Sequence, residues 1–395
     1  MEGTRKRNHF NLEIFTLSIA FLMMGLLYSW SNFARQIEVE EGWSSQITST
    51  VFTCSIISFS IGNLLGDGCC KRIGVRGSIL VVAGLMGIGL IAAASAKQAW
   101  ALILYYGWIW GAAVGLGYNV LLGYAAYLVP NRAGTISGAL LMLYGFGSLI
   151  TGGLVTFIMG HIGWRCAFVC IGVIYCVVFC FVSRSIGSIS NASSRAGCCD
   201  TTASPHTAVR TRFFWVCYFW CFTLLTGGVT FVGRAADIAM HVTSISAIVA
   251  SVFVGVLSCA NGVGRLIAGA LFDRVDLRLL MILVAVGEAL GIGFTCVAIS
   301  IGSLTILMVG YILIGSTYGA VLTLGIAAMR REYGEPYYKF NMALILTSSI
   351  PSSLLGPSVA SFILDRTDNY IIVFPILMGL AILGSVFGAV ARSKT

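Results

Sequence analysis

The sequence predicts an all-α membrane protein with twelve transmembrane helices, arranged as two pseudo-symmetric six-helix bundles. Three observations lead to this prediction: an apolar composition, a series of apolar segments of membrane-spanning length, and basic residues concentrated in alternate loops. Of the 395 residues, 58% are hydrophobic and only 10% are charged, whereas a soluble domain has about 25% charged residues. Such a chain cannot cover a folded surface with polar side chains, which argues against soluble globular, disordered and disulfide-scaffold proteins.

Twelve apolar segments follow one another along the chain, and most are long enough to cross a bilayer, which takes about 20 apolar residues. They show no period-two alternation, which argues against a β-barrel. The first segment follows a basic triplet but lacks a small-residue cleavage site, so we expect an uncleaved helix rather than a signal peptide. The predicted spans are residues 12–34, 46–65, 77–96, 100–128, 134–159, 164–183, 212–234, 245–270, 279–300, 303–329, 340–363 and 370–391.

Basic residues distinguish the two sides of the membrane. Eighteen of the 24 Lys and Arg residues lie at the termini and in the loops that follow even-numbered spans. Because cytoplasmic loops are enriched in Lys and Arg, this predicts a multi-pass cell-membrane protein with both termini in the cytoplasm. Topology thus accounts for the net charge of +9, and nucleic-acid binding is not expected. Five basic residues are assigned to the opposite side: Arg35, Lys97, Arg165, Arg234 and Arg366.

Residues 185–210 are the one long stretch that is not membrane-like. They are rich in Ser, Thr, Ala and Gly, the composition of a flexible linker, and they lie at the midpoint of the chain. We therefore predict an N-terminal six-helix half (1–184), a cytoplasmic linker (185–211) and a C-terminal six-helix half (212–395). Transporters built from two repeats have this layout.

Two loop motifs occupy corresponding positions in the two halves. Residues 269–274 (GALFDR) end span eight and resemble the cytoplasmic loop signature of the major facilitator superfamily. A Gly there permits close helix approach, and an acid can accept bonds from helix-terminal amides or from an Arg. In the first half the family's acid falls on Lys71, and Asp67, one turn earlier, is the candidate substitute. The predicted gating residues are Gly62, Asp67, Lys71, Arg72, Arg76, Gly269, Asp273 and Arg274.

Three further stretches indicate which branch of this superfamily the sequence resembles. They are residues 25–31 (GLLYSWS) with 42–44 (GWS), residues 115–119 (GLGYN) with 129–134 (VPNRAG), and residues 261–265 (NGVGR). In this order and spacing they resemble the oxalate:formate antiporter family, a branch close to the monocarboxylate porters. The resemblance covers nearly the whole chain. It implies the major facilitator fold and secondary active transport of a small organic anion by alternating access, as antiport or proton symport.

Arg265 is the principal candidate for binding the substrate. It lies inside span eight, where an Arg is costly and indicates function by default, and a guanidinium can hold a carboxylate through two parallel hydrogen bonds. The resemblance implies the same role, because the Arg at this position binds the substrate carboxylate in those families. The alternative is a structural pair with Glu288 of span nine, the one acid expected deep in a span. Glu288 could instead carry a coupling proton.

The sequence departs from both related subgroups at the expected site. Oxalate carriers have a second cation, a Lys in span eleven, where this chain has Ser349. Monocarboxylate porters have an Asp one turn before the span-eight Arg, where this chain has Asn261. A site with one fixed cation suits a formate-, lactate- or pyruvate-like monocarboxylate. An antiporter of oxalate or another dicarboxylate, and a transporter-like sensor without net transport, are the alternatives.

Other mid-span polar and aromatic residues are candidates for the same pocket. Tyrosine hydroxyls can donate to a carboxylate while the rings shape the cavity, although membrane aromatics also serve as packing. The additional candidates are Tyr28, Tyr118, Asn119, Tyr144 and Tyr318. Glycines four residues apart, Gly111 with Gly115 and Gly315 with Gly319, predict close helix contacts. These contacts could allow the halves to slide or could be ordinary tight packing.

The sequence lacks the patterns of enzymes and metal sites. It has no nucleophile elbow, phosphate loop or HExxH motif, so an enzyme is not expected. The 13 cysteines form no CxxC pairs and are expected to be small buried hydrophobes, without a metal or cofactor. The expected partners are the small organic anion, a proton or counter-anion, and the lipid bilayer. We expect a functional monomer.

Overall fold

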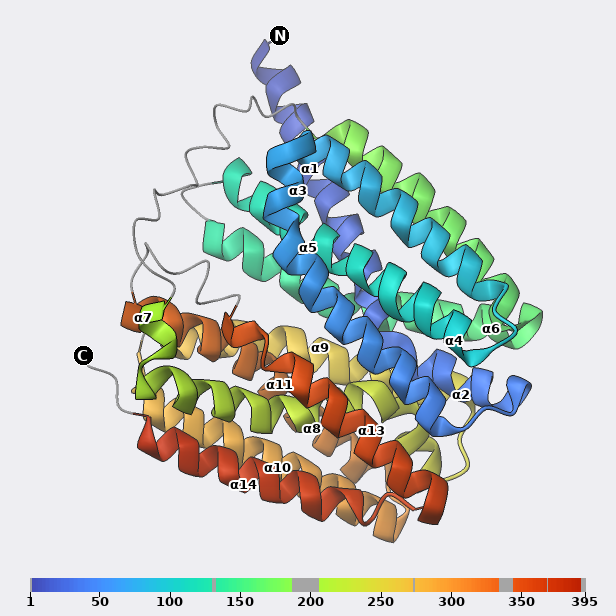
Figure 1. Ribbon diagram of the computed structural model, residues 1–395, viewed down its shortest axis with the longest axis vertical. Coiled ribbons are helices and arrows are strands. Elements are labelled where there is room, and N and C mark those ends of the chain that lie inside the picture. The colour runs from blue at the N-terminus through green and yellow to red at the C-terminus, as the bar shows by residue number, and fades with distance from the viewer. Residues whose placement is uncertain are drawn as a thin grey trace. The chain divides into compact units, whose positions relative to one another are not determined.

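The computed structural model describes residues 2–129, 133–186, 206–272, 274–333, 344–367 and 369–391. Within these ranges every regular element is a helix (Figure 1). Most helices are apolar on several faces, as expected for segments surrounded by lipid and by other helices. The elements are α1 (Glu2–Met24), η1 (Gly25–Ser29), α2 (Trp30–Glu41), α3 (Ser45–Ala94), α4 (Ala99–Leu102), η2 (Ile103–Trp110), α5 (Gly111–Leu128), α6 (Ala133–Ser185), α7 (His206–Val209), α8 (Arg212–Val242), α9 (Ala247–Phe272), α10 (Leu277–Ile301), α11 (Leu304–Tyr333), α13 (Ser349–Thr367) and α14 (Val373–Val390).

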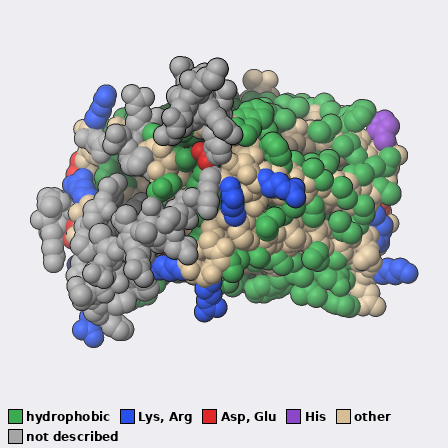
Figure 2. Space-filling model, turned by 90° about the horizontal axis from the view of Figure 1, so that it is seen from above, with side chains coloured by type: hydrophobic (Ala, Val, Ile, Leu, Met, Phe, Trp, Pro, Cys, Tyr) green, Lys and Arg blue, Asp and Glu red, His purple; other side chains and the backbone are tan. Residues whose placement is uncertain are grey.

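Nine helical stretches in the described part of the chain are long and apolar enough to cross a membrane. Their outward faces carry large hydrophobic side chains such as Leu80, Ile88, Val177 and Leu283. Figure 2 shows hydrophobic side chains spread widely over the described part of one face. A soluble protein would not expose so much apolar surface. The prediction of an all-helical, multi-pass membrane protein is therefore confirmed.

The two longest helices, α3 and α6, are each interrupted at one glycine. Gly74 in α3 has φ 73°, and Gly163 in α6 has φ 76°. Glycine adopts a positive φ without the steric cost that a Cβ imposes. Gly74 lies between the predicted spans 46–65 and 77–96, and Gly163 lies between 134–159 and 164–183. Each long helix is thus two helices joined at a glycine.

The first and fourth predicted spans differ from single regular helices. Span one is α1, a short 3₁₀ segment (η1) and α2, whereas span four begins in the short helix α4 and continues with the π-helical segment η2. In η1, a Cβ on Gly25 would overlap the carbonyl oxygen of Tyr144 on α6. The backbone can make this close approach only because residue 25 is a glycine. Irregular helical turns of this kind often lie at functional sites.

The chain divides into two compact units. Unit 1 consists of Met1–Leu27 and Cys54–Cys198, and unit 2 consists of Tyr28–Thr53 and Cys199–Thr395. The last part of span one and the start of span two therefore belong to the same unit as the C-terminal helices. The predicted boundaries at residues 184, 185 and 211 remain a prediction.

In both units the predicted glycine pairs lie at helix contacts. A Cβ on Gly115 would overlap the carbonyl oxygen of Phe59 in unit 1, and a Cβ on Gly319 would overlap that of Asn261 in unit 2. Gly111 and Gly315 make equally close contacts with the facing helices. Without a side chain at these positions, two helix backbones can touch directly.

Candidate functional site

Three of the predicted site residues lie together in unit 2. Arg265 is half-buried on α9, and its Nη2 donates a hydrogen bond to Tyr28 Oη at 3.3 Å. Tyr28 is 5% exposed and Tyr318, on α11, is 6% exposed. The two tyrosine rings meet edge to face, with their centroids 6.3 Å apart. A cation, a phenol that it contacts and a second buried ring thus form one small site.

The contact between α9 and α11 positions Arg265. A Cβ on Gly264 would overlap the carbonyl oxygen of Ser316. Across the same interface, a Cβ on Gly319 would lie 3.2 Å from Cγ of Arg265. The two helices therefore touch backbone to backbone on both sides of Arg265. Its stem rests on the glycine surface, and its guanidinium projects from a rigid pair of helices.

Two buried asparagine amides belong to the same unit and lack partners. Asn261, one turn before Arg265, is 2% exposed, and its Nδ2 has no hydrogen-bond partner among the described residues. Asn32, one turn after Tyr28, is 6% exposed, and both of its amide atoms lack a partner there. A buried polar group without a partner costs about 1–3 kcal/mol, so these amides are available to a polar ligand. The sequence analysis names Asn261 as a position of the expected site but not Asn32. Asn32 could have been found as a polar amide within an apolar run.

Ser349 begins α13 and is half-buried. Its hydroxyl donates to the carbonyl oxygen of Leu346 at 2.7 Å, within its own chain segment. A serine that satisfies its hydroxyl in this way brings no charge. In the described part of span eleven, residues 344–363, there is no Lys or Arg.

The remaining predicted pocket residues form a cluster in unit 1. The ring of Tyr118 contacts those of Phe21, Phe59 and Tyr144, with centroid separations of 5.9, 5.4 and 5.8 Å. Asn119 Nδ2 donates to Asn63 Oδ1 at 2.9 Å. The structure thus divides the predicted pocket into two sets. Three residues, Tyr118, Asn119 and Tyr144, lie in unit 1. The other three, Arg265, Tyr28 and Tyr318, lie in unit 2 with Asn261 and Ser349, and we call these three the Arg265 set.

Glu288 is buried on α10 and is 1% exposed. Its Oε1 fills the space beside Gly227 of α8, where a Cβ would overlap it. Its Oε2 has no hydrogen-bond partner among the described residues. Glu288 is not the only buried acid. Glu13 accepts a hydrogen bond from Tyr124 Oη at 2.6 Å in unit 1, which the sequence does not predict.

The predicted gating residues show limited contacts. In unit 1, a Cβ on Gly62 would overlap the carbonyl oxygen of Ala112, and Arg76 Nε donates to the carbonyl oxygen of Ile186 at 2.7 Å. Three of the predicted gating residues are exposed and form no ion pair with a described residue: Asp67, Lys71 and Arg72. Gly269 has room for a methyl group, whose nearest neighbour is Thr323 Cγ2 at 3.8 Å, so the expected close approach is absent. Arg274 is exposed, and Asp273 lies outside the described residues.

An apolar hollow on α10 and α14 contains none of the predicted site residues. It has a volume of about 410 Å³ and is lined by apolar side chains of α10 and α14, including Val286, Phe294 and Met378. A groove with so little polar surface cannot orient a carboxylate. We therefore assign the candidate site to the Arg265 set, where the charge lies.

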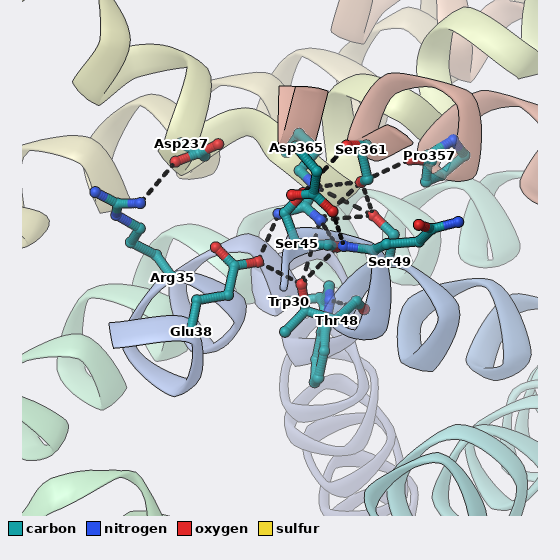
Figure 3. Close-up of polar contacts among 12 residues, drawn as sticks. Trp30, Arg35, Glu38, Ser45, Thr48, Ser49, Asp237, Pro357, Ser361 and Asp365 are labelled. Atoms are coloured by element: carbon teal, nitrogen blue, oxygen red, sulfur yellow. Dashed lines mark hydrogen bonds and ion pairs between the residues drawn. The ribbon is translucent and has the colours of Figure 1, made fainter. Parts of the chain in front are cut away.

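Arg234 is a buried charge that the sequence does not single out. Charge counting assigns it to the external side, at the end of the predicted seventh span, and the structure shows it 1% exposed on α8 in an ion pair with Glu38 at 2.7 Å. Asp237, one turn further along, is also buried and lies 3.5 Å from Arg35 (Figure 3). The available signal was two opposite charges three residues apart, at the end of an apolar run. Hydropathy assigns such charges to loops, although partners elsewhere in the chain can keep them buried.

Comparison with known proteins places this site in a family. The family model described as Major Facilitator Superfamily matches residues 15–284. The oxalate:formate antiporter of Oxalobacter formigenes is 25% identical over 369 residues, which cover 88% of this chain and 85% of that protein. The uncharacterized MFS-type transporter YhjX of Escherichia coli (strain K12) is 25% identical over 256 residues, which cover 64% of this chain and 63% of that protein.

Solved structures share the fold. The nucleoside transporter NupG has a TM-score of 0.76 at 14% identity, covering 97% of this chain and 100% of that one. The inward open conformation of the xylose transporter XylE from E. coli has a TM-score of 0.75 at 15% identity and covers 95% of each chain. These likenesses support the fold, whereas the family match and the similarity to the antiporter confirm the resemblance that the motifs indicate. Since the matching region exceeds half of the sequence, the chain belongs to the Major Facilitator Superfamily.

Proposed function

We propose that this membrane transporter carries a small organic monocarboxylate, of the formate, lactate or pyruvate kind, by alternating access. The observation that carries the proposal is Arg265, a half-buried cation on α9 whose guanidinium contacts the Tyr28 hydroxyl at 3.3 Å. An Arg at membrane depth is costly and indicates function by default. A guanidinium can hold a carboxylate through two parallel hydrogen bonds, and the amides of Asn261 and Asn32 could donate to further substrate oxygens. Membership of a transporter family confirms the expectation that the protein is not an enzyme.

Charge favours a monoanion over a dianion. Arg265 is the fixed cation of the proposed site, and Ser349 stands where the resembling oxalate carriers have a Lys. A dicarboxylate would leave one charge uncompensated in a low-dielectric cavity. The similarity to the oxalate:formate antiporter, at 25% identity, supports dicarboxylate antiport as the second candidate.

The proposal includes twelve spans in two halves, both termini in the cytoplasm of a cell-membrane protein, and a functional monomer. The interruptions at Gly74 and Gly163 support this span count, because they divide two long helices at the expected places. Helix α13, Ser349–Thr367, overlaps most of the predicted eleventh span and continues past its predicted end at residue 363. Proton symport and anion antiport are both compatible with the site, and Glu288 remains the candidate for proton coupling.

Counterflow in liposomes tests the substrate class directly. Purified protein is reconstituted in vesicles that contain one unlabelled carboxylate, and uptake of radiolabelled formate, lactate, pyruvate and oxalate is measured in parallel. We expect accumulation of at least one monocarboxylate. Empty vesicles and vesicles with a collapsed pH gradient are the controls. Exchange of oxalate without any exchange of the three monocarboxylates would contradict the proposal and support the second candidate.

Replacing Tyr28 with phenylalanine should weaken substrate affinity without abolishing transport. The change removes the hydroxyl that contacts Arg265 but keeps the ring that packs against Tyr318. One hydrogen bond to a charged group contributes about 1.5–3 kcal/mol, and at the lower end this raises KM for counterflow about tenfold. Tyr127→Phe is the matched control, since Tyr127 is 47% exposed. An unchanged KM would place Tyr28 outside the substrate site.

A further inference from the structure

A second hollow, which we call the polar hollow, lies at one end of unit 2, where α8 begins and α14 ends. It has a volume of about 370 Å³, has a largely polar surface and is lined by Arg212, Phe213, Val216, Ala389 and Val390. Figure 1 shows the start of α8 and the end of α14 at the same end of these helices. The distribution of basic residues predicts that this end faces the cytoplasm. The proposed transport of a monocarboxylate does not use the polar hollow.

Arginine residues make this end of unit 2 positive. Those with described side chains are Arg210, Arg212, Arg274, Arg278 and Arg331, whereas the described acids there are Asp276 and Glu332. Arg212 lines the polar hollow itself, is exposed and forms no ion pair with a described residue. Because α8 begins at Arg212, the positive end of its helix dipole adds to this charge. The polar hollow therefore attracts an anion.

Arg278, half-buried at the start of α10, offsets the repulsion that the end of α14 would exert on an anion. Helix α14 ends at Val390, and its C-terminal carbonyl groups carry partial negative charge. Arg278 Nε donates to the carbonyl oxygen of Ala391 at 2.7 Å, and its two Nη atoms form no hydrogen bond with a described residue. The carboxylate of Asp276 caps α10 by accepting from the backbone N–H of Arg278 at 3.1 Å. The Nη atoms of Arg278 thus remain available beside the polar hollow.

The apolar hollow between α10 and α14, which we call the α10–α14 groove, lies on a lipid-facing side of unit 2. Only 33% of the apolar core of each of these helices is buried, the lowest share among the nine spanning stretches of the described chain. A Cβ on Gly293 would meet no heavy atom within 4 Å, so the groove is open there. Its lining residues Leu290, Phe294 and Ile382 are 40–56% exposed. In a bilayer an acyl chain fills such a groove, because lipid tails are as apolar as leucine.

The α10–α14 groove leads along α14 to the polar hollow. Its lining on that helix runs from Met378 to Ser385. Ala389, which lines the polar hollow, follows one helical turn later on the same face. On α10, the groove begins at Ala285, two turns after Arg278, or about 10 Å along the helix. The two hollows thus form a path that is polar at the predicted membrane boundary and apolar deeper in the membrane.

We propose that the polar hollow and the α10–α14 groove together bind one anionic phospholipid of the cytoplasmic leaflet. Its phosphate pairs with Arg212 and Arg278, whose planar guanidinium groups match phosphate oxygens, and one acyl chain lies in the groove. The cytoplasmic leaflet supplies anionic lipids, and basic pockets between transmembrane helices bind their head groups. A free phosphate ion would leave the groove empty, so a lipid is the ligand that fits both parts. The lipid site is independent of the proposed substrate.

Native mass spectrometry of the purified full-length protein, with lipid titrated into the detergent, tests the preference for an anionic head group. The probes are dioleoyl phosphatidylglycerol and dioleoyl phosphatidylcholine, which have the same acyl chains and differ in net charge. We expect the first phosphatidylglycerol to bind with a Kd at least about tenfold lower than that of phosphatidylcholine, since two arginines contact its phosphate. An excess of inorganic phosphate should not displace it.

Arg212→Gln should raise the Kd for phosphatidylglycerol about fivefold, which is the contribution of one arginine near an anionic lipid. The Kd for phosphatidylcholine should change less. Arg184→Gln is the matched control, since Arg184 is an exposed arginine in the last turn of α6, in unit 1. It should bind phosphatidylglycerol as the wild type does.

A phosphatidylglycerol that carries a diazirine in one acyl chain locates the site in the wild-type protein. After photolysis we expect cross-links in peptides that contain residues 285–297 and 378–385, which include the lining of the groove. Ala289→Phe fills the groove and should abolish these cross-links. If Ala289→Phe gives no folded protein, cross-linking of the wild type decides.

Any of four results would overturn the lipid site: an equal Kd for the two lipids, an equal loss of binding in Arg184→Gln and Arg212→Gln, cross-links confined to other helices, or unchanged cross-links in folded Ala289→Phe. Displacement of phosphatidylglycerol by inorganic phosphate would also overturn it, because a free anion would then be the ligand. These measurements use no carboxylate. Their failure therefore rejects the lipid site alone, whereas absent counterflow in the wild type rejects the proposed function.

Discussion

Replacing Arg265 with glutamine is expected to reduce monocarboxylate counterflow to background while the protein still folds and inserts. Glutamine keeps much of the side-chain length and one donor group but removes the charge. Truncating one partner of a buried, hydrogen-bonded charge pair costs about 2–5 kcal/mol, which corresponds to a loss of affinity of about 30-fold or more. Because Arg265 is only half-buried and its stem rests on Gly319, the substitution should have little effect on packing. Counterflow and direct binding of labelled substrate both measure the effect.

Two further variants separate the role of the charge from that of the guanidinium shape and from a general loss of positive charge. Arg265→Lys keeps the charge but lacks the planar fork, so we expect weakened transport that higher substrate concentrations partly restore. Arg366→Gln is the matched control for loss of one positive charge, since Arg366 is exposed and stacks on Phe362 at 4.3 Å. It should transport normally. Normal counterflow by Arg265→Gln would reject Arg265 as the anion-binding residue.

The helical fold could be predicted because its determinants are local. Long apolar runs predict spans, and the loop between two runs predicts where a helix must break. The structure places those breaks at Gly74 and Gly163, which adopt positive φ. The 3₁₀ turn at Gly25–Ser29 and the π-helical turn at Ile103–Trp110 could not be predicted in this way. Their geometry depends on contacts with other helices, such as that between Gly25 and the backbone of Tyr144.

The candidate site was predictable where one residue carried its own signal. Arg265 is a charge in the middle of an apolar run, so its cost is visible from the neighbouring sequence. Arg234 is the last residue of the predicted seventh span, so the neighbouring sequence does not show whether it is buried. Its burial depends on Glu38, 196 positions away, and on Ser361, 127 positions away. Such partners meet only after folding, and hydropathy, a local average, does not register them.

The second large effect is expected at the contact between α9 and α11, where Gly319→Ala should both destabilise the protein and impair transport. The added methyl group would overlap the carbonyl oxygen of Asn261 and press on Cγ of Arg265. Overpacking of this kind costs about 1–3 kcal/mol. To make room, α9 must move away from α11, and Arg265 moves with it. We expect a lower melting temperature in detergent and a higher KM for counterflow.

Gly293→Ala is the control that separates the effect of the helix contact on stability from the effect of helix propensity. No heavy atom lies within 4 Å of a Cβ at Gly293 on α10, and alanine is a better helix former than glycine by about 1 kcal/mol. That variant should therefore melt at the same or a higher temperature, with unchanged KM. Gly319→Ala gains the same helix propensity, so a net loss of stability there must come from the contact. If Gly319→Ala were as stable as Gly293→Ala and transported normally, the direct backbone contact beside Arg265 would be wrong, and with it the account of how Arg265 is held in place.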